Sequence, residues 1–175
     1  MRKCGECQLC CRLLPVRELK KLANKRCQHQ RFRKGCSIYS ERPISCQLWS
    51  CCWLIGRDTE TLARPDKSHY VIDMMPDFVD VETDGVRHQV EVVQIWCDPR
   101  FREAHRDSEL RAFIERRALE GIIALVRFNT RDDAIVLIAP CLMDNGKWLE
   151  QAGVCTVEHS AAEIVNTLGL KVELK

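Results

Sequence analysis

The amino-acid sequence predicts an α+β protein in which a small, metal-stapled, cysteine-rich N-terminal module packs on a domain with an antiparallel sheet. Three observations support this fold class. Nine of the twelve cysteines lie in the first 52 residues, the two halves carry opposite net charge, and the hydrophobic patterns of strands and helices dominate the second half. We place the boundary so that residues 1–64 form the metal-binding module and residues 65–175 form the α+β domain.

The first feature along the chain is the run Cys-Gly-Glu-Cys-Gln-Leu-Cys-Cys, which begins at Cys4. Thiols spaced three residues apart can be directed at one centre by a tight turn, as they are in metal-binding loops. In a reducing compartment, clustered cysteines bind metal more often than they form disulfides. Because we find neither a signal peptide nor a run of about 18 apolar residues, we expect a cytoplasmic protein that does not span a membrane.

Short helices are expected between the cysteines. Pro15 suits the first turn of a helix over residues 15–24, because a backbone N–H would have no partner there in any case. Pro43 suits the start of another helix, which would carry Cys46 and two tryptophans. These aromatic side chains would give the segment the dry, apolar surroundings that stabilise bonds between thiolates and metal.

The charge of the chain is divided between its two parts. Residues 1–64 hold 14 Lys or Arg and five Asp or Glu, a balance of +9, whereas residues 65–175 hold 13 and 20, a balance of −7. Cations beside cysteine ligands lower the pKa of the thiols and neutralise the metal site, and this interpretation of the basic half is the one we favour. An acidic protein partner and nucleic acid are the alternatives.

The most specific local pattern is Gly-Cys-Ser-Ile-Tyr-Ser-Glu-Arg-Pro-Ile-Ser-Cys at residues 35–46. Together with the opening Cys-x-x-Cys-x-x-Cys-Cys it resembles a family of cysteine-cluster proteins described as zinc- or iron-chelating, and the similarity extends from Cys4 to about Cys52. The eighth ligand falls on Cys51 or Cys52, and we prefer Cys51. The resemblance thus implies the metal ligands Cys4, Cys7, Cys10, Cys11, Cys27, Cys36, Cys46 and Cys51.

The identity of the metal stays open at this point. Eight cysteines divide into two four-coordinate zinc sites, each of which can supply about 10 kcal/mol or more of folding free energy. The spacing of Cys4, Cys7 and Cys10 is also typical of iron–sulfur proteins, so a [4Fe–4S] cluster is the alternative cofactor. Adjacent side chains diverge, so Cys10 and Cys11 would more easily serve different metals, or one would be a ligand and the other a thiol beside the metal site. Disulfides or free thiols are the third possibility.

The second half alternates between strand and helix patterns. A turn at Thr83-Asp84-Gly85 predicts a hairpin, and Asp107 or Ser108 can cap a helix that Gly121 ends. A second hairpin is expected from residues 122–128 and 134–139. A capping box at residues 160–163 predicts the start of the last helix. The expected strands are 68–75, 78–82, 86–96, 122–128, 134–139 and 170–174, and the expected helices are 109–120 and 160–168.

Signatures of catalysis were sought in the second half without success: there is no phosphate-binding glycine loop, no Gly-x-Ser-x-Gly and no His-Glu-x-x-His. We expect an acid–base site to be absent, because loop carboxylates are usually solvated caps. The residues considered for one are His105, Asp98, Asp107, Asp132 and Asp133. Three later cysteines, expected to be small buried thiols, are Cys97, Cys141 and Cys155.

These observations favour a metal-binding protein over an enzyme. Its Cys-ligated zinc or iron–sulfur centre would be structural and would support a surface for a protein partner. The first alternative is an iron–sulfur redox or metal-handling protein. Nucleic-acid binding through the basic half is possible but is not favoured.

Overall fold

The computed structural model describes residues 2–152, except residues 57, 74, 76, 84, 131 and 132 and the side chains at 80–83, 87 and 88. The helix and strand expected after residue 160 lie outside this range. The described elements, in chain order, are α1 (Leu9–Leu13), η1 (Arg17–Leu19), β1 (Gln30–Arg31), β2 (Gly35–Cys36), η2 (Tyr39–Glu41), α2 (Ile44–Leu48), α3 (Cys52–Ile55), α4 (Pro65–Ser68), β3 (Tyr70–Ile72), β4 (Asp77–Thr83), β5 (Val86–Cys97), η3 (Arg102–Arg106), α5 (Ser108–Ala118), β6 (Ile123–Arg127), β7 (Ala134–Ile138), η4 (Pro140–Leu142) and β8 (Leu149–Ala152).

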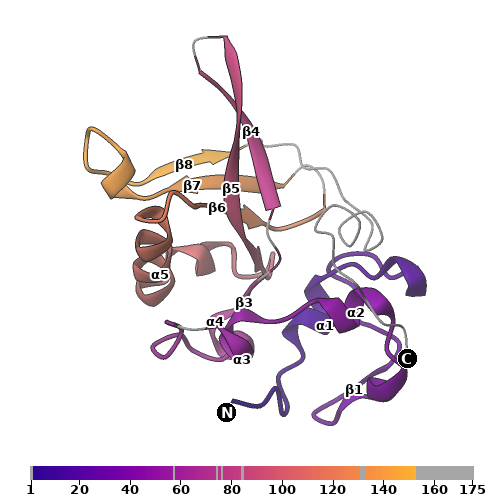
Figure 1. The fold of residues 1–175 in the computed structure, drawn as a ribbon. Coiled ribbons are helices and arrows are strands. Elements are labelled where there is room, and N and C mark those ends of the chain that lie inside the picture. The colour runs from indigo at the N-terminus through magenta and orange to yellow at the C-terminus, as the bar shows by residue number, and fades with distance from the viewer. Residues whose placement is uncertain are drawn as a thin grey trace.

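The described residues of the second half form one six-stranded sheet, which confirms the α+β class (Figure 1). Strands β3, β5, β6, β7 and β8 are neighbours in that order, and β4 also pairs with β5. The expectation of an antiparallel sheet is wrong at one place, because β5 and β6 are parallel. The reason is that α5 lies between these strands in the chain, and a helical crossover returns the chain in the same direction, which a short hairpin loop does not allow.

Strand β5 is the long central element of this sheet. Residues 86–92 pair with β4 in the predicted hairpin, and residues 95–97 pair with β3 on the same side. Its other side pairs with β6 over residues 92–96. The predicted hairpin of β6 and β7 is also confirmed, whereas β8 was not predicted.

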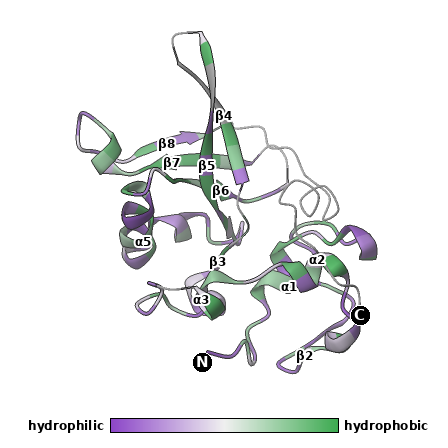
Figure 2. Cartoon of the chain, viewed as in Figure 1, coloured by the Kyte–Doolittle hydropathy of each residue, from purple (hydrophilic) through white to green (hydrophobic). Residues whose placement is uncertain are grey.

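Helix α5 covers one face of the sheet. Asp107 caps its first turn by accepting a hydrogen bond from the Leu110 backbone N–H at 2.9 Å, as the sequence predicts. Gly121 follows the helix with a φ of +83°, a conformation that glycine adopts without a Cβ clash. The apolar stripe of the helix, which contains Phe113 and Ile114, packs into the main core with Ile95 and other sheet residues. Figure 2 shows this stripe alternating with hydrophilic residues.

The N-terminal part consists mainly of loops, and two helix predictions are wrong there. Only Arg17–Leu19 is helical within residues 15–24, because the backbone groups of Val16 and Lys21 pair with each other and close the segment into a turn. The helix expected from Pro43 ends at Leu48, and α3 begins separately at Cys52.

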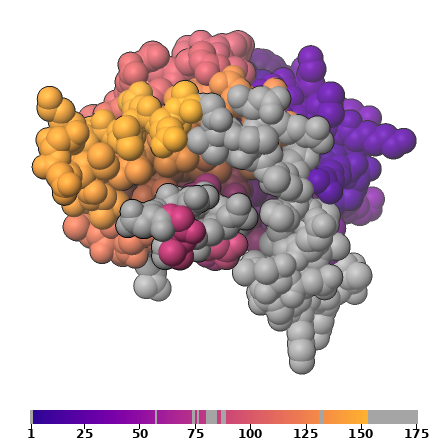
Figure 3. Space-filling model, turned by 90° about the horizontal axis from the view of Figure 1, so that it is seen from above, coloured from indigo at the N-terminus to yellow at the C-terminus, as the bar shows by residue number. Residues whose placement is uncertain are grey.

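The two parts share apolar contacts. Leu9 and Leu13 from α1 form a cluster with Val71 of β3 and Trp96 of β5, and Leu13 is completely buried. Cys52 and other residues of the first part join the main core under the sheet. Seen from above in Figure 3, the N-terminal residues lie on one side of the molecule and β8 lies on the opposite side. Within the described residues we find no helix with the length and hydrophobicity that a bilayer crossing requires.

Candidate metal centre

The eight predicted ligands lie on loops and short elements around α1. A tight turn, closed by a hydrogen bond from the Cys7 N–H to the Cys4 carbonyl at 2.8 Å, leads into α1, which carries Cys10 and Cys11. The Cys27 N–H donates to the Cys11 carbonyl at 3.2 Å, so the loop after α1 returns to the cysteine run. The remaining three predicted ligands lie on β2, on α2 and just before α3, and they are Cys36, Cys46 and Cys51.

Most of these thiols are close enough to affect the ionisation of others. Burial is the largest cause of a raised pKa at Cys4, Cys7 and Cys51. Thiolate charge adds to the shift in each case, from Cys11 at Cys4, from Cys4 at Cys7, and from Cys7 and Cys4 at Cys51. Burial also raises the pKa of Cys46 to about 11, and the thiolates of Cys11 and Cys27 add to the shift. Two groups of neighbouring thiols result. The first comprises Cys4, Cys7, Cys10 and Cys51, and the second comprises Cys11, Cys27 and Cys46. Cys11 also raises the pKa values of Cys4 and Cys10.

Cys10 and Cys11 connect the two groups through a hydrogen bond between their side chains. This bond lowers the pKa of Cys11 to about 7 and raises the pKa of Cys10, which is also buried. The nearby ammonium of Lys21 lowers the pKa of Cys11 as well. Cys11 is therefore the first thiol of the pair to ionise, and Cys10 is the donor.

Cys51 and Cys52, at the end of the cysteine segment, have different surroundings. The ionisation of Cys51 responds to Cys7 and Cys4, whereas that of Cys52 responds to Arg117 and Asp73. Cys52 also belongs to the main core. These environments place Cys51 with the other thiols and Cys52 with the packing of the α+β part.

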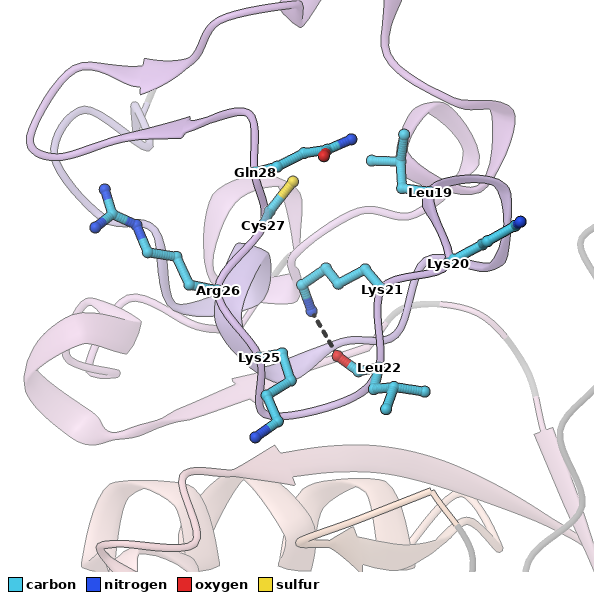
Figure 4. Close-up of a pocket in the computed structure, with 8 residues that line it drawn as sticks. All are labelled: Leu19, Lys20, Lys21, Leu22, Lys25, Arg26, Cys27 and Gln28. Carbon is cyan, nitrogen blue, oxygen red and sulfur yellow. Dashed lines mark hydrogen bonds between the residues drawn. The ribbon is translucent and has the colours of Figure 1, made fainter.

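Lys21 is a buried cation beside the thiols, and no sequence pattern indicated this role. Its ammonium donates to the carbonyls of Arg12 at 3.1 Å and Leu22 at 3.2 Å, and also to that of Leu14 (Figure 4). Burial lowers its pKa, and negative charge on four thiols opposes this shift. The four are Cys27, Cys11, Cys10 and Cys46. A buried ammonium with thiolate neighbours fits the counter-charge interpretation of the basic half.

Sequence reasoning also missed Gln8, which lies within the cysteine run and is buried. Its amide nitrogen donates to the Gly35 carbonyl at 3.2 Å and to the Arg31 carbonyl, and its oxygen accepts from the Gln30 amide at 2.8 Å. Gln8 thus joins α1 to the β1–β2 hairpin that carries Cys36. The one feature of the sequence that could have indicated this role of Gln8 is the presence of a polar residue between closely spaced cysteines.

As positioned in the structure, the thiols do not form a finished ligand set. Over the described residues there is no group of three or more His, Cys, Asp or Glu side chains arranged to hold a metal ion. All eleven cysteines in the same residues are free thiols. The donor chemistry fits zinc or an iron–sulfur cluster, since thiolates are preferred ligands of both.

The residues considered for acid–base chemistry do not meet at one place. Asp98 binds Arg12 and Arg100, Asp107 caps α5, and Asp133 pairs with Arg102. His105 is buried beside Glu150, and Asp132 lies outside the described residues. Of the later thiols, Cys97 is buried as predicted. Cys141 is exposed, contrary to the prediction, because it lies in the short helix η4 after the last buried strand, and Cys155 is outside the described range.

We find no match between this chain and any family model, curated protein or solved structure.

Proposed function

We propose that this chain is a metal-binding protein that holds zinc or an iron–sulfur centre through cysteine thiolates of its first 64 residues. The residues that would hold the metal are the eight predicted ligands, with Cys51 rather than Cys52 at the end of the set. Once bound, the metal would supply cross-links between loops that have few apolar contacts of their own. We propose a cytoplasmic location, in which the thiols stay reduced.

The observation that carries this proposal is the crowding of thiols around one buried cation. Neighbouring thiolates add to the raised pKa values of five predicted ligands, which are Cys4, Cys7, Cys10, Cys46 and Cys51, and Lys21 lies beside four thiols of the set. Without metal, thiolates placed this closely repel each other. A divalent cation replaces this repulsion with coordination bonds, so the arrangement favours metal.

A structural role is supported better than a redox role. The thiol-bearing elements are only two to five residues long, and α1 joins them to the sheet through Leu9 and Leu13. Ordering loops costs about 1–2 kcal/mol per residue in backbone entropy, which a metal can offset. We propose that the module so ordered presents a surface to a protein partner. An iron–sulfur redox or metal-handling protein is the second candidate, favoured by the exposed position of Cys4.

The test is elemental analysis of protein purified without oxygen, together with its visible spectrum. We expect zinc or iron in amounts comparable to the protein, and a brown colour would identify an iron–sulfur cluster. Cys7→Ser and Cys36→Ser should each lower the metal content, because a hydroxyl oxygen is a poor substitute for a thiolate. Cys141→Ser is the matched control, since Cys141 is an exposed thiol far along the chain. Equal metal content in all three variants, or none in the native protein, would contradict the proposal.

A further inference from the structure

Six exposed cations between residues 20 and 34 are free of carboxylate partners among the described residues. None of them is within ion-pair distance of an acidic side chain, whereas arginines of the second half, such as Arg102 and Arg111, are paired. We call these six residues the basic face, and they are Lys20, Lys25, Arg26, Arg31, Arg33 and Lys34. Their charge is available to an anionic partner.

Three residues of the basic face lie near one another before the β1–β2 hairpin. A hollow of about 300 Å³ is lined by Lys20, Lys25 and Arg26, among other residues (Figure 4). Arg26 also donates to the Gln30 carbonyl at 3.1 Å, at the start of β1. In the close-up, Lys21 is turned toward the Leu22 carbonyl, while the side chains of Lys20 and Lys25 extend away from the hollow.

The tip of the hairpin is a four-residue turn in which every side chain is exposed. The Lys34 N–H donates to the Arg31 carbonyl at 2.9 Å, and Arg33 adopts a φ of +55°. Phe32 is 71% exposed, and the Arg33 guanidinium lies 5.2 Å from the centre of its ring. An aromatic ring between three cations, placed in water, is a feature with no role in the core.

The hairpin is held in place by a buried polar side chain. Gln8 is 8% exposed, and its amide contacts both β-strands through the Gly35 and Arg31 carbonyls and the Gln30 side chain. A buried amide is stable only when it is hydrogen-bonded, so these contacts fix the hairpin to α1. Phe32 is therefore presented by an anchored element.

A second exposed aromatic lies at the other end of the hairpin. Tyr39 follows β2 by three residues and is 65% exposed. The Arg42 guanidinium lies 4.2 Å from the centre of its ring and donates to the Cys46 and Tyr39 carbonyls at 3.1 Å each. Both ends of the hairpin thus combine an exposed ring with a guanidinium.

We propose that the basic face and the two aromatic rings form a binding site for single-stranded nucleic acid. Unpaired bases can stack on Phe32 and Tyr39, and Arg31, Arg33 and Lys34 can contact phosphates. An acidic peptide would satisfy the cations but would leave both rings in water. The combination of rings and unpaired cations therefore favours nucleic acid over an acidic protein segment.

The experiment measures fluorescence anisotropy of a labelled single-stranded oligonucleotide of about 12 nucleotides, a length within the usual site sizes. Full-length protein is titrated at several salt concentrations, with the same sequence as a duplex and a polyglutamate peptide as competitors. We expect binding that weakens with salt and is competed better by the single strand than by either competitor. Phe32→Ala should weaken binding about tenfold through loss of stacking. Phe78→Ala is the control, because Phe78 is also exposed but lies on β4.

A second pair of variants tests the charges. Replacing both Arg33 and Lys34 with Ala should lower the salt slope by about two, whereas Lys147→Ala, at an exposed lysine near β8, should leave it unchanged. Absence of binding at low salt, equal effects of Phe32→Ala and Phe78→Ala, or stronger competition by polyglutamate would each overturn the inference. Metal content is measured on the same samples, so that a loss of binding caused by loss of metal is distinguished from a loss caused by the missing ring or charges.

Discussion

The guanidinium of Arg12 binds the carboxylate of Asp98, which connects helix α1 to the end of strand β5 across 86 positions of sequence. Asp98 is 1% exposed and also receives hydrogen bonds from Arg100, including one at 3.0 Å. Because Arg12 follows Cys11 directly, this ion pair fixes the position of the cysteine run against the sheet.

Removal of the Asp98 charge should destabilise the protein. Burial alone would raise the pKa of Asp98, but hydrogen bonds from Arg100 and the charge of Arg12 outweigh burial and hold the pKa below its ordinary value. We expect Asp98→Asn to cost about 2 kcal/mol of unfolding free energy at pH 7, measured by urea denaturation. The exposed pair of Asp133 and Arg102 provides the control, and Asp133→Asn should cost less than about 1 kcal/mol.

The same variant should change the response to acid. A carboxylate whose pKa is lowered by folding gives its full stabilisation above the unfolded pKa of about 4 and loses it as the pH falls through the folded pKa. The difference in stability between the native protein and Asp98→Asn should therefore shrink below about pH 4. A difference that stays constant down to pH 2 would show that the carboxylate does not contribute through its charge.

The cap of α5 gives a second prediction. Asp107 accepts from the Leu110 N–H at 2.9 Å and from the hydroxyl of buried Tyr70 at 3.2 Å. Asp107→Ala removes both bonds and should cost about 1–2 kcal/mol, which thermal unfolding can measure. Asp107→Asn retains an acceptor and should lose less than half as much. Equal losses would mean that the charge, rather than the cap, is what stabilises the helix.

The cysteine doublet gives a third prediction, which rests on the proposed function. Cys51→Ala should lower the metal content, because Cys51 lies with Cys7 and Cys4. Cys52→Ala should keep the metal and lower the unfolding free energy by about 1 kcal/mol through a small core cavity. The two variants form a matched pair of neighbouring thiols. Loss of metal in Cys52→Ala but not in Cys51→Ala would mean that Cys52, rather than Cys51, is the ligand.

Lys21 allows a test of the counter-charge interpretation. Lys21→Met keeps the length of the side chain but removes a positive charge next to the thiolates, and we expect metal affinity to fall about tenfold, as for one pKa unit of interaction energy. Competition with a coloured chelator at neutral pH measures this change. Lys20→Met is the control, since Lys20 is the neighbouring lysine and is exposed, whereas Lys21 is buried. Equal metal affinities of the two variants would mean that Lys21 stabilises the loop but does not act on the metal site.

The dependence of the first part on metal can be measured by amide hydrogen exchange. Under reducing conditions, a strong chelator should abolish protection over residues 4–52, while residues 90–96 and 123–138 stay protected. The basis is that the sheet has its own core, which includes Ile95 and Val126. Loss of protection in both parts would mean a single cooperative unit built around the metal, and retention in both would mean that metal is not needed for the fold.

Local patterns in the sequence predicted most of the sheet. The hairpin of β4 and β5 and the cap at Asp107 depend on residues close in sequence, and both are confirmed. The parallel pairing of β5 and β6 and the strand β8 were missed. Strand β8 has an exposed, polar sequence, so its pairing with β7 depends on tertiary contacts that no local pattern records.

The conformation of the cysteine segment was less predictable than that of the sheet. Residues 15–24 have helical spacing of apolar residues, yet Lys21 turns its ammonium inward to three carbonyls and the segment closes on itself. The burial of Gln8 depends on a hairpin more than 20 residues away. Long-range hydrogen bonds of this kind replace regular elements here, and they cannot be read from spacing.

The cluster of Leu13 with Val71 and Trp96 has a consequence for synthesis of the chain on the ribosome. The cysteines are made first, but Trp96 is added 83 residues after Leu13. At about 5–20 residues per second, α1 waits roughly 4–17 seconds before its docking surface exists. During that interval α1 has no sheet to cover it. If the proposed function holds, the order of translation therefore sets a time window in which the first thiols can take up metal.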